Sequence, residues 1–121
     1  MHIWQSRWDE YMAYERITVV GNIGRLECKV SDKGQPYAKM TLAVNRTKGV
    51  APIWYSVFLF GAYAKDFEKL KAIYRPGRVT LVEGRPQTEA YKTSDGKLAV
   101  DNSIVAISMP ECLDAAPTTT R

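Results

Sequence analysis

The sequence predicts an all-β domain, a five-stranded barrel with one helix between the third and fourth strands. Its 121 residues suffice for one domain, and with 45% hydrophobic and 25% charged residues the chain has the composition of a folded protein. Five segments alternate apolar and polar residues as strands do, and one segment has helical spacing. Glycines interrupt the first strand segment, as expected of a strand that curves and pairs on both sides.

Three strands precede the helix. The first is expected over residues 16–30, with kinks at Gly21 and Gly24. Turn-forming residues then lead into a second strand over 38–44. A loop separates this strand from the third, over 53–61, which is rich in aromatic and β-branched residues.

The helix and two further strands follow. Four residues share one helix face and predict an amphipathic helix of about three turns: Tyr63, Phe67, Leu70 and Tyr74. The fourth strand is expected over 79–91 and the fifth over 98–109, where a change of apolar phase predicts a bulge near Asn102 and Ser103. This order is that of the oligonucleotide/oligosaccharide-binding (OB) fold. A small open sheet packed on one helix is the competing architecture.

The chain divides into a basic body and two slightly acidic ends. Residues 16–109, the expected OB domain, hold 15 Lys and Arg against 8 Asp and Glu, which suits a ligand with phosphates. Residues 1–15 form an N-terminal extension, in which helical spacing of Trp4, Trp8 and Tyr11 predicts a short helix. Residues 110–121 form a short C-terminal tail.

Several classes of function are disfavoured. No segment resembles a membrane span or a secretory signal, so we expect a cytoplasmic protein without membrane contact. The one histidine, His2, lies outside the expected domain, and Cys28 and Cys112 lie far apart without a CxxC motif. We expect two reduced thiols, no catalytic residue, no metal and no cofactor.

The third strand carries the functional signal. Alternation places Val57 and Leu59 on the core face and Trp54, Phe58 and Phe60 on the outer face. Exposed rings in a basic domain suit single-stranded nucleic acid, because stacking is worth roughly 1–3 kcal/mol per base whatever the sequence. The alternative is that this face packs under a loop or against another subunit.

Residues outside this strand would complete the interface. Tyr91 and Lys92, at the end of the fourth strand, would extend the aromatic platform. Arg46 and Lys48, in the loop after the second strand, and Arg75, after the helix, are further candidates for phosphate contacts.

Short motifs in this order resemble the landmarks of the bacterial and mitochondrial single-stranded DNA-binding proteins. They are Val19-Val20-Gly21-Asn22-Ile23-Gly24-Arg25, Thr41-Leu42-Ala43, the run from Trp54 to Gly61, Gly77, and Val82-Glu83-Gly84. The resemblance covers about 16–109 and implies an OB fold, a nucleoid-associated protein and a homo-oligomer, either tetramer or dimer. It also implies sequence-tolerant binding of single-stranded DNA in replication, recombination or repair. Trp54, Phe60 and Tyr91 fall where the family stacks bases, and Arg16 where it contacts a phosphate.

The chain also departs from the family pattern. Lys48 stands where the family often has an aromatic residue, and Ser56, Gln87, Glu89 and Ala90 stand where it often has cations. Fewer rings and cations predict weaker and more salt-sensitive binding.

Another departure concerns partner proteins. The acidic, apolar tip of the family's long tail is missing, so we do not expect repair or replication partners to be recruited through one. A second hypothesis is a diverged interaction module of the primosome-accessory type, in which the same aromatic face binds a protein and DNA binding is vestigial.

Overall fold

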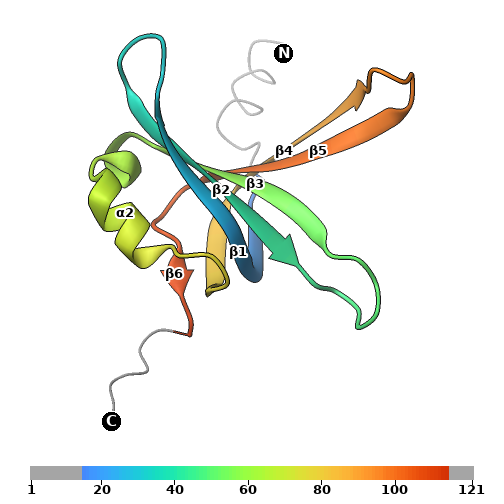
Figure 1. Cartoon of the computed structure of the whole chain (residues 1–121), viewed down its shortest axis with the longest axis horizontal. Helices are drawn as coiled ribbons and strands as arrows, with labels where there is room; N and C mark the ends of the chain where they lie inside the picture. The colour runs from blue at the N-terminus through green and yellow to red at the C-terminus, as the bar shows by residue number, and fades with distance from the viewer. Residues whose placement is uncertain (1–14, 115–121) are drawn as a thin grey trace, which may run out of the picture.

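The computed structural model describes residues 15–114, which form one six-stranded sheet with two short helical segments after its third strand. The strands are β1 (Ile17–Val30), β2 (Pro36–Val44), β3 (Ile53–Phe60), β4 (Val79–Lys92), β5 (Leu98–Ala106) and β6 (Glu111–Cys112). A 3-10 helix, η1 (Gly61–Ala64), and an α-helix, α2 (Phe67–Ile73), connect β3 to β4. The predicted order of three strands, helix and two strands is confirmed (Figure 1). The helix predicted in the N-terminal extension lies outside the described residues.

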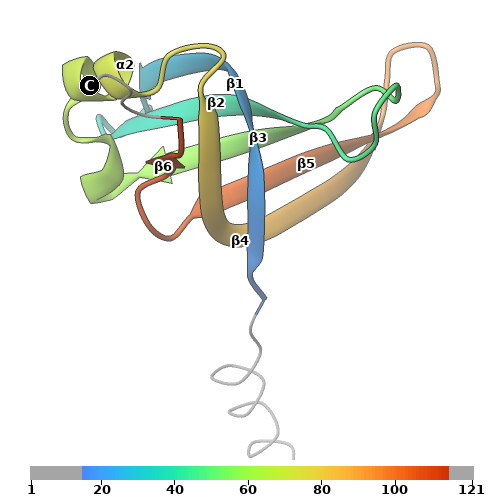
Figure 2. The same ribbon diagram turned by 90° about the horizontal axis from the view of Figure 1, so that it is seen from below.

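Strand β1 closes the sheet into a ring. Residues 17–22 of β1 pair with β4, and residues 22–30 pair with β2. The ring continues through β3, which pairs with β5 in parallel, and β5 pairs with β4 (Figure 2). The open sheet is therefore excluded. The predicted kink at Gly24 coincides with a register shift between β1 and β2, which falls between Ile23 and Arg25.

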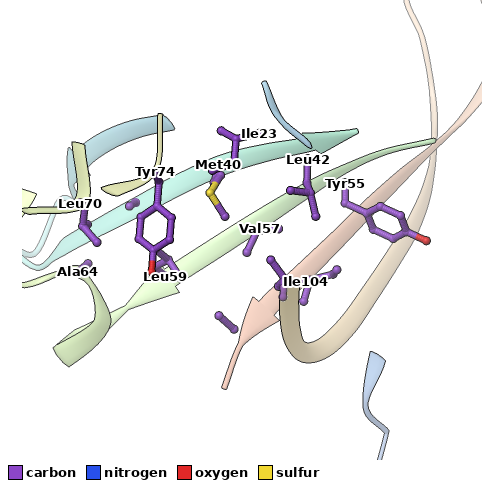
Figure 3. Packing of buried hydrophobic residues seen from close by; sticks show 13 residues of the cluster. Ile23, Met40, Leu42, Tyr55, Val57, Leu59, Ala64, Leu70, Tyr74 and Ile104 are labelled. Carbon is purple, nitrogen blue, oxygen red and sulfur yellow. The ribbon is translucent and has the colours of Figure 1, made fainter. Parts of the chain in front are cut away.

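Alternate residues of the strands fill the inside of the ring (Figure 3). Val57 and Leu59, predicted to face the core, are completely buried. Leu70 and Tyr74, from α2 and its C-cap, close the end of the ring at which α2 lies. Burial of each large apolar side chain contributes about 1.5–3 kcal/mol, so the strand pattern itself stabilises the ring.

The helix is shorter than the three turns predicted. Asp66 has extended backbone angles, and its carboxylate accepts a hydrogen bond of 3.1 Å from the Lys69 backbone N–H. Asp66 is therefore the N-cap that starts α2. Tyr63 lies before this cap, in η1, where its hydroxyl donates to the Ile107 carbonyl at 2.8 Å. The apolar spacing thus spans two helical segments.

The prediction for the fifth strand was wrong in two respects. β5 ends at Ala106 instead of residue 109, and its register with β4 is continuous from Ala106 to Leu98, without a bulge at Asn102 or Ser103. The outer parts of β4 and β5 leave the ring as a two-stranded arm (Figure 1). Because no core covers either face of this arm, Val100 is exposed, and the apolar alternation lapses without a change of register.

The start of the predicted tail packs against the ring. In β6, Cys112 pairs with Thr80 of β4, and the Tyr74 hydroxyl donates to the Pro110 carbonyl at 2.7 Å. The Asp114 carboxylate accepts hydrogen bonds from the Val79 backbone N–H and the Arg78 side chain, which lower its pKa. The Cys112 thiol and the Cys28 thiol are both free, as predicted.

We predict that the protein loses stability at alkaline pH because Tyr74 is buried. Burial, with a smaller effect of the Cys112 thiol, raises the pKa of Tyr74 from 10.0 to about 12. The folded chain therefore holds this proton more tightly than the unfolded chain. The resulting stability, up to about 2–3 kcal/mol, is complete below pH 10 and is lost between about pH 10 and 12.

Urea unfolding of Tyr74→Phe tests this prediction. The variant should lose about 1 kcal/mol at neutral pH, because the hydrogen bond to Pro110 is gone, and should show a shallower decline above about pH 10. Tyr91→Phe is the control for general alkaline effects, since Tyr91 is exposed. Equal slopes in the two variants would contradict the assignment to Tyr74.

Candidate nucleic-acid interface

The outer face of β3 presents two large exposed rings. Trp54 is 54% exposed and Phe60 is 48% exposed, whereas Tyr55, Val57 and Leu59 between them face the core. The predicted alternation of this strand is therefore confirmed. Phe60 lies six positions after Trp54, about 20 Å along β3, so the two rings can contact different nucleotides of one strand.

Small residues on neighbouring strands make room for Trp54. Trp54 lies opposite Ala43 of β2, and its indole reaches over β2 towards β1. A Cβ atom added to Gly24 of β1 would lie 2.7 Å from the indole Cζ3 and 2.7 Å from the Thr41 hydroxyl oxygen. The absence of a side chain at Gly24 therefore leaves the space that the indole occupies.

Phe60 belongs to a cluster of three rings, which we call the ring cluster: Tyr37, Phe58 and Phe60. The centroids of Phe58 and Phe60 are 5.9 Å apart with an interplanar angle of 7°, and those of Tyr37 and Phe60 are 5.9 Å apart at 30°. Sequence reasoning did not assign Tyr37 to the interface. Its place opposite Phe60 depends on the pairing of β2 with β3, which the alternation within each strand does not reveal.

Tyr91 lies on the β4–β5 arm. Its side chain is 51% exposed, and the alternation of β4 places it on the same face as Glu89. Glu89 pairs with Asp101 of β5, so two carboxylates lie between Tyr91 and the ring. The structure therefore places Tyr91 on the arm, where β5 lies between its strand and the strand that carries Trp54 and Phe60.

Three of the predicted cations lie at the end of the ring from which the arm projects. Arg46 and Lys48 are exposed in the β2–β3 loop, and this loop and the arm extend from the same end in both views (Figures 1 and 2). The Arg46 guanidinium donates to the Tyr55 hydroxyl at 3.5 Å. Lys92 is exposed near the tip of the arm. Trp54 is the second residue of β3, so it lies beside this loop.

The other two predicted cations lie elsewhere. Arg16 precedes β1, and its guanidinium forms an ion pair with Glu83 of β4 at 3.2 Å. Arg75 is exposed in the α2–β4 loop, at the helix end of the ring (Figure 1). The structure therefore groups Arg46, Lys48 and Lys92 near one end and leaves these two apart.

The sheet also places in one cross-strand row with Phe58 two cations that sequence reasoning missed. Lys39 of β2 lies opposite Phe58, and on the other side Val105 of β5 pairs both with Phe58 and with Arg85 of β4. Lys39 alternates with buried residues and so shares the outer face of the sheet. The row crosses four strands and consists of Lys39, Phe58, Val105 and Arg85. Only the register between strands that are distant in the sequence shows that these residues are neighbours.

Residues 15–114 contain neither a metal-binding cluster nor a helix that could span a membrane. Within residues 15–114, no group of three or more His, Cys, Asp or Glu side chains is arranged to hold a metal ion. In the same range, no helix has the length and the apolar character needed to cross a membrane.

Sequence comparisons identify relatives. The sequence model of the Single-strand binding protein family matches residues 14–110. The mitochondrial single-stranded DNA-binding protein rim1 of Schizosaccharomyces pombe is 35% identical over 82 residues, which are 67% of this chain and 53% of the relative. The chain thus spans about half the length of this curated relative.

Solved structures share the fold. A small single-stranded DNA-binding protein from Streptomyces coelicolor superimposes with a TM-score of 0.65 at 18% identity, over 81% of this chain and 94% of its own. Plasmodium falciparum SSB in complex with ssDNA gives 0.61 at 19% identity, over 84% and 96%. Mitochondrial Rim1 from S. cerevisiae gives 0.59 at 22% identity, over 83% and 95%. The predicted OB architecture is therefore confirmed.

Proposed function

Because this chain belongs to the single-strand binding protein family, we propose that it binds single-stranded DNA with little regard to sequence and so protects single strands in replication, recombination or repair. The outer face of β3 carries the proposal, because Trp54 and Phe60 stay half exposed on a rigid strand. Bases stack on such rings whatever their identity. The function requires binding alone and no chemical step.

The proposed contacts divide between rings and cations. Trp54 and Phe60 stack bases on β3, and Tyr91 stacks a base on the arm. Arg46, Lys48 and Lys92 contact phosphates at the end where the β2–β3 loop and the arm project. Arg16 and Arg75 contact phosphates farther along the bound strand. Support for these roles comes from the exposure of the rings and from the grouping of the loop and arm cations.

Tryptophan fluorescence tests the function directly. Titration with poly-dT should quench the emission, less strongly as salt rises, while a duplex of equal charge should quench it little. The chain has three tryptophans, so a matched variant must show which of them is quenched. Trp54→Phe keeps a ring at this position without the indole and should abolish most of the quenching. Equal quenching by duplex and single strand would contradict the proposal and would favour the protein-binding module instead.

The acidic pair on the arm predicts a gain in affinity. Glu89 and Asp101 face each other between Tyr91 and the ring, where a passing phosphate meets two like charges. Glu89→Gln with Asp101→Asn should tighten binding of dT oligonucleotides about two- to tenfold at low salt, and less at high salt.

A control of equal charge separates this local effect from a general one. Glu68→Gln with Asp32→Asn removes two exposed acids from α2 and from the β1–β2 turn. Fluorescence anisotropy of a labelled oligonucleotide gives both affinities. An equal gain in the two double variants would assign the effect to net charge alone.

We also propose that the chain is a homo-oligomer, either a dimer or a tetramer. Leu98 and Val100 support this, since both are exposed on the arm and would be covered by a neighbouring subunit. Light scattering coupled to size exclusion gives the subunit count.

The proposed location is a nucleoid, in the cytoplasm as the sequence predicts, whereas the S. pombe relative is named as mitochondrial. Cell fractionation decides between these compartments.

A further inference from the structure

A second aromatic and charged surface adjoins the ring cluster, on the outer faces of β2 and β1. Tyr37 and Lys39 of β2 face outwards, because Ala38 and Met40 beside them are completely buried. The residues opposite them on β1 are charged, with Lys29 opposite Tyr37 and Glu27 opposite Lys39. We call this surface the β1–β2 track: Arg25, Glu27, Lys29, Tyr37 and Lys39.

The aromatic surface does not end at β3. The Tyr37 ring stacks with Phe60 across the β2–β3 pairing, with centroids 5.9 Å apart. Neighbouring strands are about 4.8 Å apart, so Tyr37 carries the aromatic surface one strand closer to β1. Lys29 continues the same row on β1. A single strand of DNA that reaches Phe60 can therefore contact the Tyr37 ring on β2 and then the Lys29 ammonium group on β1.

The charged part of the track has a carboxylate between two cations. Glu27 forms ion pairs with Arg25 at 3.0 Å and with Lys29 at 3.5 Å. The Arg25 and Lys29 side chains are 71% and 50% exposed, whereas Glu27 is 30% exposed. Exposed ion pairs of this kind are weak in water, so both cations can turn from the carboxylate to another anion at little cost. A phosphate group matches this position in charge and in hydrogen-bond acceptors.

We propose that bound single-stranded DNA continues from Phe60 over Tyr37 onto β1, where Arg25 and Lys29 exchange Glu27 for DNA phosphates. This inference rests on the proposed function and extends its binding path by two strands. Lys39, between the ring cluster and Glu27, contacts the phosphate on the way. Glu27 then acts as an internal competitor that lowers the affinity for DNA.

Two substitutions test the two parts of the path. Tyr37→Val removes the ring but keeps a residue suited to a strand, and should weaken binding of a labelled dT oligonucleotide about five- to hundredfold. Tyr37→Phe keeps the ring and should bind almost as the wild type does. Glu27→Gln frees both cations and should tighten binding about two- to tenfold, with a steeper salt dependence of about 0.7 in log–log slope per phosphate gained.

Controls keep the outcomes distinct. Glu111→Gln removes one exposed acid from β6, which pairs with β4, and should change affinity less than Glu27→Gln. Urea unfolding shows whether Tyr37→Val is folded. If it is not, Glu27→Gln tests the path by itself. The path is overturned if the wild type prefers single strands while Tyr37→Val binds equally well and Glu27→Gln matches Glu111→Gln. If the wild type shows no preference for single strands, the proposed function fails and the path fails with it.

Discussion

Replacement of Trp54 and Phe60 together by alanine is expected to abolish tight binding of single-stranded DNA. Each ring stacked on a base contributes about 1–3 kcal/mol, so loss of both should weaken binding by at least about thirtyfold. Stability should change little by comparison, because both side chains are half exposed and neither belongs to the core. Anisotropy of a labelled dT oligonucleotide measures the affinity of the double variant and of each single variant.

The control for this experiment removes exposed apolar side chains away from the β3 face. Met109→Ala with Leu113→Ala alters two such residues near β6 and should leave the affinity unchanged. Equal affinity of the Trp54/Phe60 variant and this control would show that the β3 face does not stack bases. A protein-binding role for the face would then be preferred.

Substitution of Gly84 by alanine is expected to have the largest effect on stability. At Gly84, β4 passes from its pairing with β1 to its pairing with β5. An added Cβ would overlap the carbonyl oxygen of Val105 and would lie 2.7 Å from the Ile104 Cγ2 atom. Because the obstacle includes backbone of a paired strand, it cannot rotate away. We expect a loss of about 3 kcal/mol or more in the free energy of unfolding.

Gly49→Ala provides the comparison for this prediction. Gly49 has a positive φ of 84° and no neighbouring atom within 4 Å of an added Cβ, so its substitution carries backbone strain without a clash. That strain should cost only about 1 kcal/mol. Urea unfolding should therefore give Gly84→Ala a much lower free energy of unfolding than Gly49→Ala. The reverse order would mean that β4 and β5 can separate at this corner without loss.

Local sequence patterns sufficed to predict the order of the strands and, in the third strand, the face on which each side chain lies. Alternation is a property of a single strand, so it correctly assigned Val57 and Leu59 to the core and Trp54 and Phe60 to the outer face. Gly24 likewise marked the bend at which β1 shifts register. The functional roles assigned to these rings and to the cations stay predictions until binding is measured.

Which residues of different strands lie together became apparent only from the folded sheet. Tyr37 reached Phe60, and Gly24 made room for Trp54, through pairings between separate strands that no local pattern encodes. The bulge predicted near Ser103 was wrong for the same reason, because its evidence was a lapse in alternation where β5 leaves the ring. Local periodicity reports which face of a strand is buried, whereas the register between strands is set by how all five strands fill one core.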